Sequence, residues 1–227
     1  SFFHPEELDV KTKAWLRHYF EEQIYPVVTP LAVDSGHPFP FLANNTINAI
    51  VRIFQVQPDG TKDYKIAILP IPSVLDRIIE VPSSSNKVHR FVYLEDVISY
   101  YAIQFFQGYG IEEAMIFRLT RDADLEIDEE DAKDLLTEVE ASLRRRRRGD
   151  AVRLEVVGAG SPELLRTVLA SVELEEKDVY HIDGHLDCRM YFDFSNYPGY
   201  DNLRYKPFEP KIPSDLIGFE GENLLDV

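Results

Sequence analysis

The chain has 227 residues, a hydrophobic fraction of 44% and a formal net charge of −16. Its one cysteine, Cys188, excludes an intrachain disulfide and any multi-cysteine metal site, and no apolar run is long enough to predict a membrane span. A chain this acidic repels polyanions, so we predict no nucleic-acid partner, and any phosphate-chain binding requires a local basic site.

The first part of the chain predicts a helix, an extended arm and a β-hairpin. Glu6 to Ile24 carries apolar residues along one helical side. Four prolines between Pro26 and Pro40 forbid a regular helix, while the apolar residues among them require burial, so we expect a fixed, extended arm. Ile47 to Val56 is apolar on both faces, which is typical of a central strand, and Tyr64 to Leu69 returns as its hairpin partner.

The next segments alternate between the two element types. Arg77 to Val81 fits a short strand or the end of a short helix, and a loop follows at Ser83 to Asn86. Val88 to Tyr93 predicts a strand because its side chains alternate, and Glu95 to Phe106 predicts a helix that Gly108 ends.

The best-specified unit begins at Met115. A strand over Ile116 to Thr120 precedes an amphipathic helix over 128–148, whose first turn is acidic and whose last turn is five arginines, as the helix dipole favours. Val152 to Val157 then predicts a strand, Ser161 caps a helix, and Asp178 to Ile182 predicts a last short strand. This order indicates an α+β fold: a two-layer α/β sandwich with a mostly antiparallel, mixed sheet, preceded by a helix and a proline-rich arm.

The standard catalytic motifs are absent from the sequence. It contains no phosphate-binding loop of the Walker type, no G-x-G-x-x-G, no G-x-S-x-G and no H-E-x-x-H. His181 and His185 have a spacing that suits a metal on a helix, but Gly184 lies between them and the segment does not read as a helix. We therefore predict no catalytic residue and no metal site.

Each of two basic segments can be interpreted either as a functional site or as an ordinary structural feature. Arg144 to Arg148 could bind phosphate, but consecutive helical residues point in all directions, which favours a solvated helix end. Arg121, between Thr120 and the carboxylates of Asp122 and Asp124, could belong to an acid–base pair, but a local Arg–Asp pair at a helix cap is the simpler interpretation.

Several stretches resemble one family in the same order along the chain. They are VVTPLAVDSGHPFPFLANN, FVYLEDVI, FRLTRDADLEIDEEDAKDLL, VRLEV, the SPELL helix and KPFEP. These resemble the bacterial polyphosphate kinase family that uses a phosphohistidine, and the resemblance runs from about His18 to the end. The resemblance is less informative at the arginine run, Arg144 to Arg148, because the family pattern does not assign these residues to polyphosphate.

The resemblance implies a head, or middle, domain of a four-domain phosphotransferase. Residues 1–24 would be the helix from the N-terminal domain, 25–213 the head domain and 214–227 the connection to the first C-terminal domain. Because the chain starts at Ser1 and stops on an apolar run, we also expect a fragment. The family transfers the terminal phosphate of ATP to polyphosphate, and the nucleophilic histidine belongs to the C-terminal domains. The resemblance thus implies no cofactor in this chain, and ATP and Mg²⁺ for the parent enzyme in the cytoplasm, with membrane association of the parent left open.

Three hypotheses follow. In the first, the chain serves dimerisation and domain arrangement and lacks the catalytic histidines, and its partners are the other domains and a second copy. In the second, it is a polyanion-binding module that guides polyphosphate. In the third, it is a small enzyme using the carboxylates beside Arg121. The polyphosphate- or interdomain-contact candidates are Arg121, Asp122, Asp124, Arg144, Arg145 and Arg153, and the interface candidates are Pro38, Phe39, Phe41, Tyr191, Phe192 and Tyr197.

Overall fold

A computed structural model of the chain describes residues 1–83, 88–122 and 149–211. The predicted helix over 128–148 and most of the predicted loop at Ser83 to Asn86 lie outside these residues. The chain forms two compact units, Ser1–Met190 and Tyr191–Val227. The predicted domain boundaries at residues 24 and 213 concern a longer protein and stay predictions.

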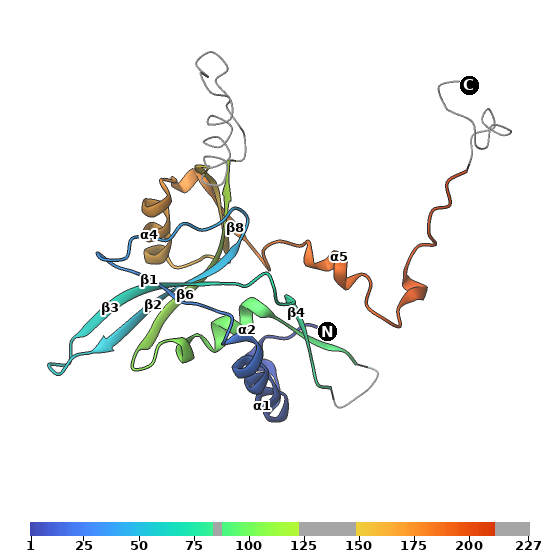
Figure 1. The fold of residues 1–227 in the computed structure, drawn as a ribbon, viewed down its shortest axis with the longest axis horizontal. Coiled ribbons are helices and arrows are strands. Elements are labelled where there is room, and N and C mark those ends of the chain that lie inside the picture. The colour runs from blue at the N-terminus through green and yellow to red at the C-terminus, as the bar shows by residue number, and fades with distance from the viewer. Residues whose placement is uncertain (84–87, 123–148, 212–227) are drawn as a thin grey trace, which may run out of the picture. The chain divides into compact units, whose positions relative to one another are not determined.

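The first unit is built on a six-stranded mixed sheet (Figure 1). Its strands lie in the order β1-β3-β2-β6-β7-β8, and every neighbouring pair is antiparallel except β7 and β8. A separate antiparallel pair, β4 with β5, lies beside it. The strand bounds are β1 Leu31–Val33, β2 Ile47–Val56, β3 Lys62–Pro70, β4 Ile78–Val81, β5 Arg90–Tyr93, β6 Gly110–Arg121, β7 Ala151–Val157 and β8 Val179–Ile182.

Short helices connect and cover the strands. In the first unit they are η1 Pro5–Glu7, α1 Val10–Tyr19, the π-helical turn η2 Phe20–Ile24, α2 Leu94–Tyr100, η3 Ala102–Phe105, α4 Pro162–Val172 and η4 Glu176–Asp178. Helix α5 Met190–Phe194 and the turn η5 Asp201–Leu203 follow. The Ser161 hydroxyl accepts a hydrogen bond from the Leu164 amide, so the predicted N-cap of α4 is confirmed. The predicted first helix starts later than expected, because Asp9 caps α1 by accepting from the Thr12 amide.

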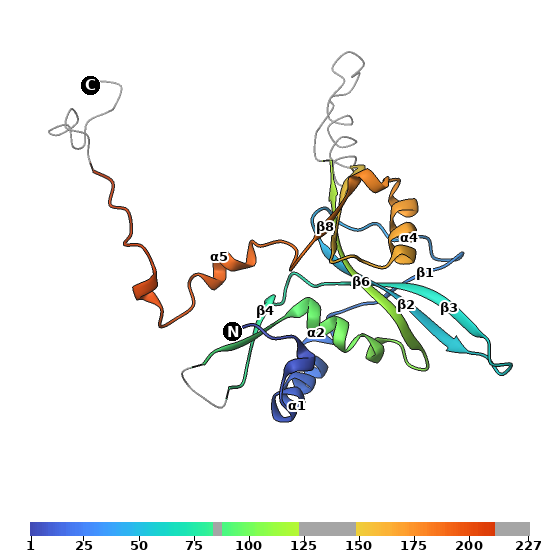
Figure 2. The ribbon, with the colours of Figure 1, turned by 180° about the vertical axis from the view of Figure 1, so that it is seen from behind.

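Helices cover both faces of the sheet (Figures 1 and 2). On one face, α1, η2 and α2 bury Leu16, Phe20 and Val97 against Ala49 and Val51 of β2, and this cluster is the first core. On the other face, α4 packs on Ile50, Phe117 and Leu154 to form the second core. The α+β class and the mixed sheet are confirmed, but the helices make three layers where two were predicted. The reason is that β2 is apolar on both faces and each face requires a cover.

The proline-rich arm is fixed on the rest of the unit, as predicted. Leu31 to Val33 pair with Ile66 to Ile68 of β3 and extend the sheet at its edge. Val28 and Leu42 are buried, in the first and the second core respectively. The arm can form an edge strand although it is rich in proline. A strand at the edge of a sheet needs N–H donors on one side only, so a missing donor on the other side is tolerated. The ambiguous segment at Arg77 to Val81 contributes strand β4.

Candidate functional site

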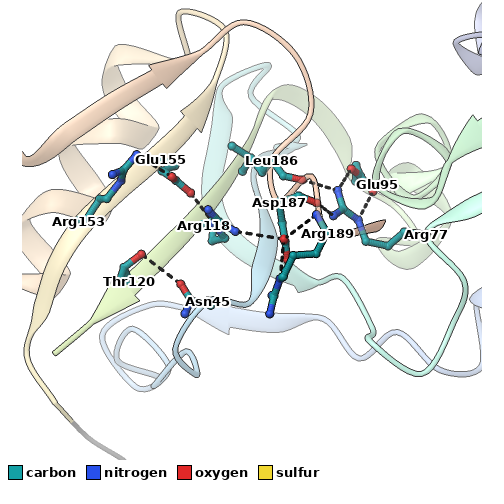
Figure 3. A network of polar contacts seen from close by, with 10 residues as sticks. All are labelled: Asn45, Arg77, Glu95, Arg118, Thr120, Arg153, Glu155, Leu186, Asp187 and Arg189. Atoms are coloured by element: carbon teal, nitrogen blue, oxygen red, sulfur yellow. Dashed lines mark hydrogen bonds and ion pairs between the residues drawn. The ribbon is translucent and has the colours of Figure 1, made fainter. Parts of the chain in front are cut away.

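A chain of alternating charges lies on the sheet face opposite α4 (Figure 3). Arg118 of β6 lies directly across from Glu155 of β7, and Thr120 lies across from Arg153. Their neighbours Leu119 and Leu154 point into the second core, so the alternation of a strand places these polar side chains on the other face. We call the series Arg153–Glu155–Arg118–Asp187–Arg189 the charge ladder.

Each carboxylate of the ladder is shared by two arginines. Glu155 accepts from Arg118 Nε, and its Oε1 lies 2.9 Å from Arg153 Nη2. Asp187 Oδ1 lies 3.6 Å from Arg118 Nη1 and accepts a 2.7 Å hydrogen bond from Arg189 Nε. The hydrogen bond from Arg189 lowers the pKa of Asp187 below its usual range, although burial opposes the shift. The ladder therefore joins two neighbouring strands to the segment that follows β8.

A second polar centre, the Arg77 cluster, holds the same segment from the other side. Arg77, just before β4, pairs with Glu95 in the first turn of α2. Its guanidinium also donates to the carbonyls of Leu186 at 2.8 Å and Asp187 at 2.9 Å (Figure 3). Leu186 itself is buried in the first core. Residues 186–187 are thus held by Arg77, which lies just before β4, and by Arg118 of β6.

The pKa values of two carboxylates in α2 are shifted in opposite directions. Burial would raise the pKa of Glu95, but hydrogen bonds from His185 and Arg77 outweigh it, and the pKa lies below its usual range. Burial raises the pKa of Asp96, which lies 3.2 Å from His4 Nδ1 and 3.9 Å from His185 Nε2. Despite these imidazoles, no group of three or more metal-ligating side chains with suitable geometry occurs among the residues that the structure describes.

The titration of Asp187 makes the stability of the unit sensitive to acid. A carboxyl whose folded pKa is depressed contributes stability that is present above its unfolded pKa, near 3.8, and is lost as the pH falls through the folded value. We expect Asp187→Asn to lower the free energy of unfolding at neutral pH by about 1 to 2 kcal/mol and to reduce its loss below about pH 4. Urea unfolding across pH would show this. Asparagine tolerates the positive φ of 56° at this position, and an unchanged acid profile would contradict the prediction.

The structure brings one of the predicted contact residues, Arg153, into the ladder. Arg121 lies instead at the end of β6, where it donates to the carbonyls of Leu42 and Gly149, each at 2.9 Å. The Phe41 ring covers its guanidinium at 4.3 Å. Asp122 is exposed, and its amide donates to the Asp150 carbonyl at 2.8 Å. Asp124, Arg144 and Arg145 lie outside the described residues.

Arg121 therefore joins the arm to the paired ends of β6 and β7. We expect Arg121→Ala to lower the free energy of unfolding by about 1 to 3 kcal/mol, because two partly buried carbonyls lose their donor. Arg121→Lys is the matched control, since an ammonium keeps the charge but cannot span both carbonyls as the planar guanidinium does. Chemical denaturation would rank the variants, and equal stability of arginine and alanine would exclude this role.

The interface candidates lie in both units. Pro38 is exposed, Phe39 packs at the margin of the second core, and Phe41 is 52% exposed while covering Arg121. In the second unit, Phe192 is 77% exposed, Tyr191 is exposed, and the Tyr197 ring lies 5.8 Å from the Phe194 ring. Phe39 thus has a structural role inside the chain, and Phe192 presents the most open ring of the six candidates.

The sequence-based reasoning missed most of the ladder and the whole Arg77 cluster. Arg118 and Glu155 each interrupt an apolar strand, and a charged residue at such a position requires a partner, so a signal existed. No signal placed Asp187 beside Arg118 or Leu186 beside Arg77, because these pairs join residues 69 and 109 positions apart.

Comparisons with known proteins match this chain to one family. The family model described as the polyphosphate kinase middle domain matches residues 11–194. This chain belongs to the polyphosphate kinase family. Polyphosphate kinase from Halalkalibacterium halodurans is 40% identical over 216 residues, and the one from Pseudomonas syringae pv. tomato is 38% identical over 211 residues. The predicted family is confirmed.

A solved structure supports the fold. The crystal structure of polyphosphate kinase from Porphyromonas gingivalis superposes with a TM-score of 0.69 at 22% identity, covering 92% of this chain and 29% of that one. The curated relatives are likewise longer: the match covers 94% of this chain and 30% of the Halalkalibacterium kinase, 92% and 28% for the Pseudomonas kinase. The chain therefore spans about a third of these kinases. None of the helices in the described residues is both long and apolar enough to cross a bilayer.

Proposed function

We propose that this chain is the middle domain of an ATP:polyphosphate phosphotransferase and that it arranges the other domains and supports a homodimer rather than carrying the chemistry. The transfer of the ATP terminal phosphate through a phosphohistidine, with ATP and Mg²⁺ as ligands, then belongs to other parts of a cytoplasmic parent enzyme. The names of the relatives support the reaction, and the match to their middle domain supports the role.

The observation that carries the proposal is the pairing of the arginines with the chain's own groups. Arg77 pairs with Glu95, Arg90 with Asp9, and Arg52 with Glu163. Paired guanidinium groups join elements to one another and present little charge to a substrate. Arg77 also holds the segment at residues 186–187, after which the chain continues into the second unit. A domain whose elements are fixed to one another by ion pairs is suited to positioning neighbouring domains.

The absence of chemistry in the chain itself is testable by assay. We expect the 227-residue chain, given ATP, Mg²⁺ and polyphosphate, to show no polyphosphate synthesis above a buffer blank. Phosphotransfer by a histidine requires an activated nucleophile, and the proposal places that histidine outside this chain. Measurable ATP-dependent polymer growth that is lost on heat inactivation of the chain would contradict it and would favour the reading as a small enzyme.

The association role is tested by solution mass. We expect light scattering at increasing concentrations to show a shift from monomer to dimer, because Phe192, Tyr205 and Phe208 are exposed apolar groups of the kind that interfaces cover. Phe192→Ser should shift the midpoint to higher concentration, whereas Val10→Ser, an equally exposed site in α1, should not. A strict monomer at all concentrations would remove dimerisation from the proposal.

A further inference from the structure

The charge ladder contains three arginines and two carboxylates, so it carries one positive charge that its own members leave unbalanced. The Arg52 cluster differs, because three carboxylates, Glu112, Glu113 and Glu163, surround that guanidinium. In an acidic chain, a local surplus of positive charge on one sheet face is the basic site that polyanion binding requires.

The surplus charge is located at the Arg153 end of the ladder. At the other end, Arg189 donates two hydrogen bonds to Asp187, at 2.7 and 2.6 Å, in the fork geometry that satisfies both groups. At this end, Arg153 contacts Glu155 at 2.9 Å, and Glu155 also pairs with Arg118. The Arg153 Nε atom is buried without a hydrogen-bond acceptor among the described residues. Within the described residues the pairing of Arg153 is therefore incomplete, unlike that of Arg189.

The surroundings of Arg153 suit an oxyanion. Its guanidinium lies 4.0 Å from the centre of the Tyr180 ring, which fixes its plane, and the side chain is 42% exposed, so a ligand can reach it. Thr120 lies directly across from it on β6, and the Thr120 hydroxyl donates to Asn45 Oδ1 at 3.2 Å (Figure 3). That contact leaves the amide N–H donors of Asn45 for another acceptor. Guanidinium and amide donors on one face are groups that bind phosphate oxygens.

We propose that Arg153, with Asn45 and Thr120 beside it, forms a subsite that binds one phosphate group of a polyphosphate chain. The proposal rests on the function proposed above, since it names the place where the middle domain contacts the polymer. It assigns no role in bond making or breaking. A single subsite with one unbalanced guanidinium guides the polymer without holding it tightly. Weak binding of this kind lets the polyphosphate slide as it is elongated.

The test is the affinity of the 227-residue chain for inorganic polyphosphate of defined length, measured by isothermal titration calorimetry at low ionic strength. We expect Arg153→Ala to weaken binding about tenfold, the effect of losing one charge-assisted donor group, and to reduce its salt dependence. Arg153→Lys should fall between, because it keeps the charge without the fork. Glu155 retains its ion pair with Arg118 in both variants, so the thermal unfolding temperature should remain close to that of the unsubstituted chain.

Arg166→Ala is the matched control. Arg166 is exposed on α4, which covers the opposite face of the sheet, and its loss changes the net charge by the same amount. Equal weakening by Arg153→Ala and Arg166→Ala would reduce the effect to net charge and overturn the subsite. Full retention of binding by Arg153→Ala, or no binding by the unsubstituted chain, would overturn it as well.

Two further arms identify the ligand. Orthophosphate at the same phosphorus concentration should compete weakly, and full displacement would overturn the assignment to a polymer. Polyglutamate that binds more tightly than polyphosphate in an Arg153-dependent way would transfer the subsite to carboxylates of a protein partner. Light scattering on the unsubstituted chain separates this proposal from the association role, because a monomeric chain that still binds polyphosphate would contradict only the association role.

Discussion

Arg77→Ala is expected to lower the free energy of unfolding by about 3 to 5 kcal/mol, because it leaves the carboxylate of Glu95 buried without its cation. The Glu95 side chain is 2% exposed, and the same guanidinium also serves the carbonyls of Leu186 and Asp187. Urea unfolding at neutral pH measures the effect.

Two further variants decide whether the burial of the charge is the cause. The double variant with methionine at positions 77 and 95 removes both charges and should recover much of the loss, because a buried apolar pair carries no desolvation cost. Arg189→Ala breaks an ion pair whose arginine is 72% exposed and should cost less than about 1 kcal/mol. If Arg77→Ala costs no more than Arg189→Ala, the cluster does not hold the segment at residues 186–187.

Phe20→Ala is expected to cost about 3 to 5 kcal/mol. Phe20 is fully buried in the first core, with ring centroids 4.7 Å from Tyr101 and 5.5 Å from Phe105. The substitution therefore opens a cavity between the N-terminal helical segment and the end of α2. A loss of this size in chemical denaturation, with a single transition, would show that residues 10–24 fold with the sheet.

Val10→Ala supplies the control within the same segment. Val10 is 84% exposed at the start of α1, so its truncation should change stability by no more than about 0.5 kcal/mol. A small effect of Phe20→Ala, similar to that of Val10→Ala, would mean that the helix docks only loosely. It would then support the prediction that residues 1–24 belong with a preceding domain.

Most of the strands were predictable because their signal is local. The alternation or continuity of apolar side chains placed β2 at Ile47–Val56, the residues of the observed strand. The N-cap at Ser161 was predictable for the same reason, since capping depends on residues three positions apart. The apolar pattern on both sides of β2 also contained the information that both faces would be covered, which the two-layer prediction did not use.

The sequence by itself determined the family, the α+β class, the local elements and the overall acidity, because each follows from motifs or from neighbouring residues. Tertiary structure alone decided which charges meet. Asp187 reaches Arg118 only because the segment after β8 crosses the sheet, and Arg153 is left with an unbalanced charge only because Arg118 occupies the same carboxylate. Pairing of buried charges depends on distances between residues far apart in the chain, and no local pattern encodes those distances.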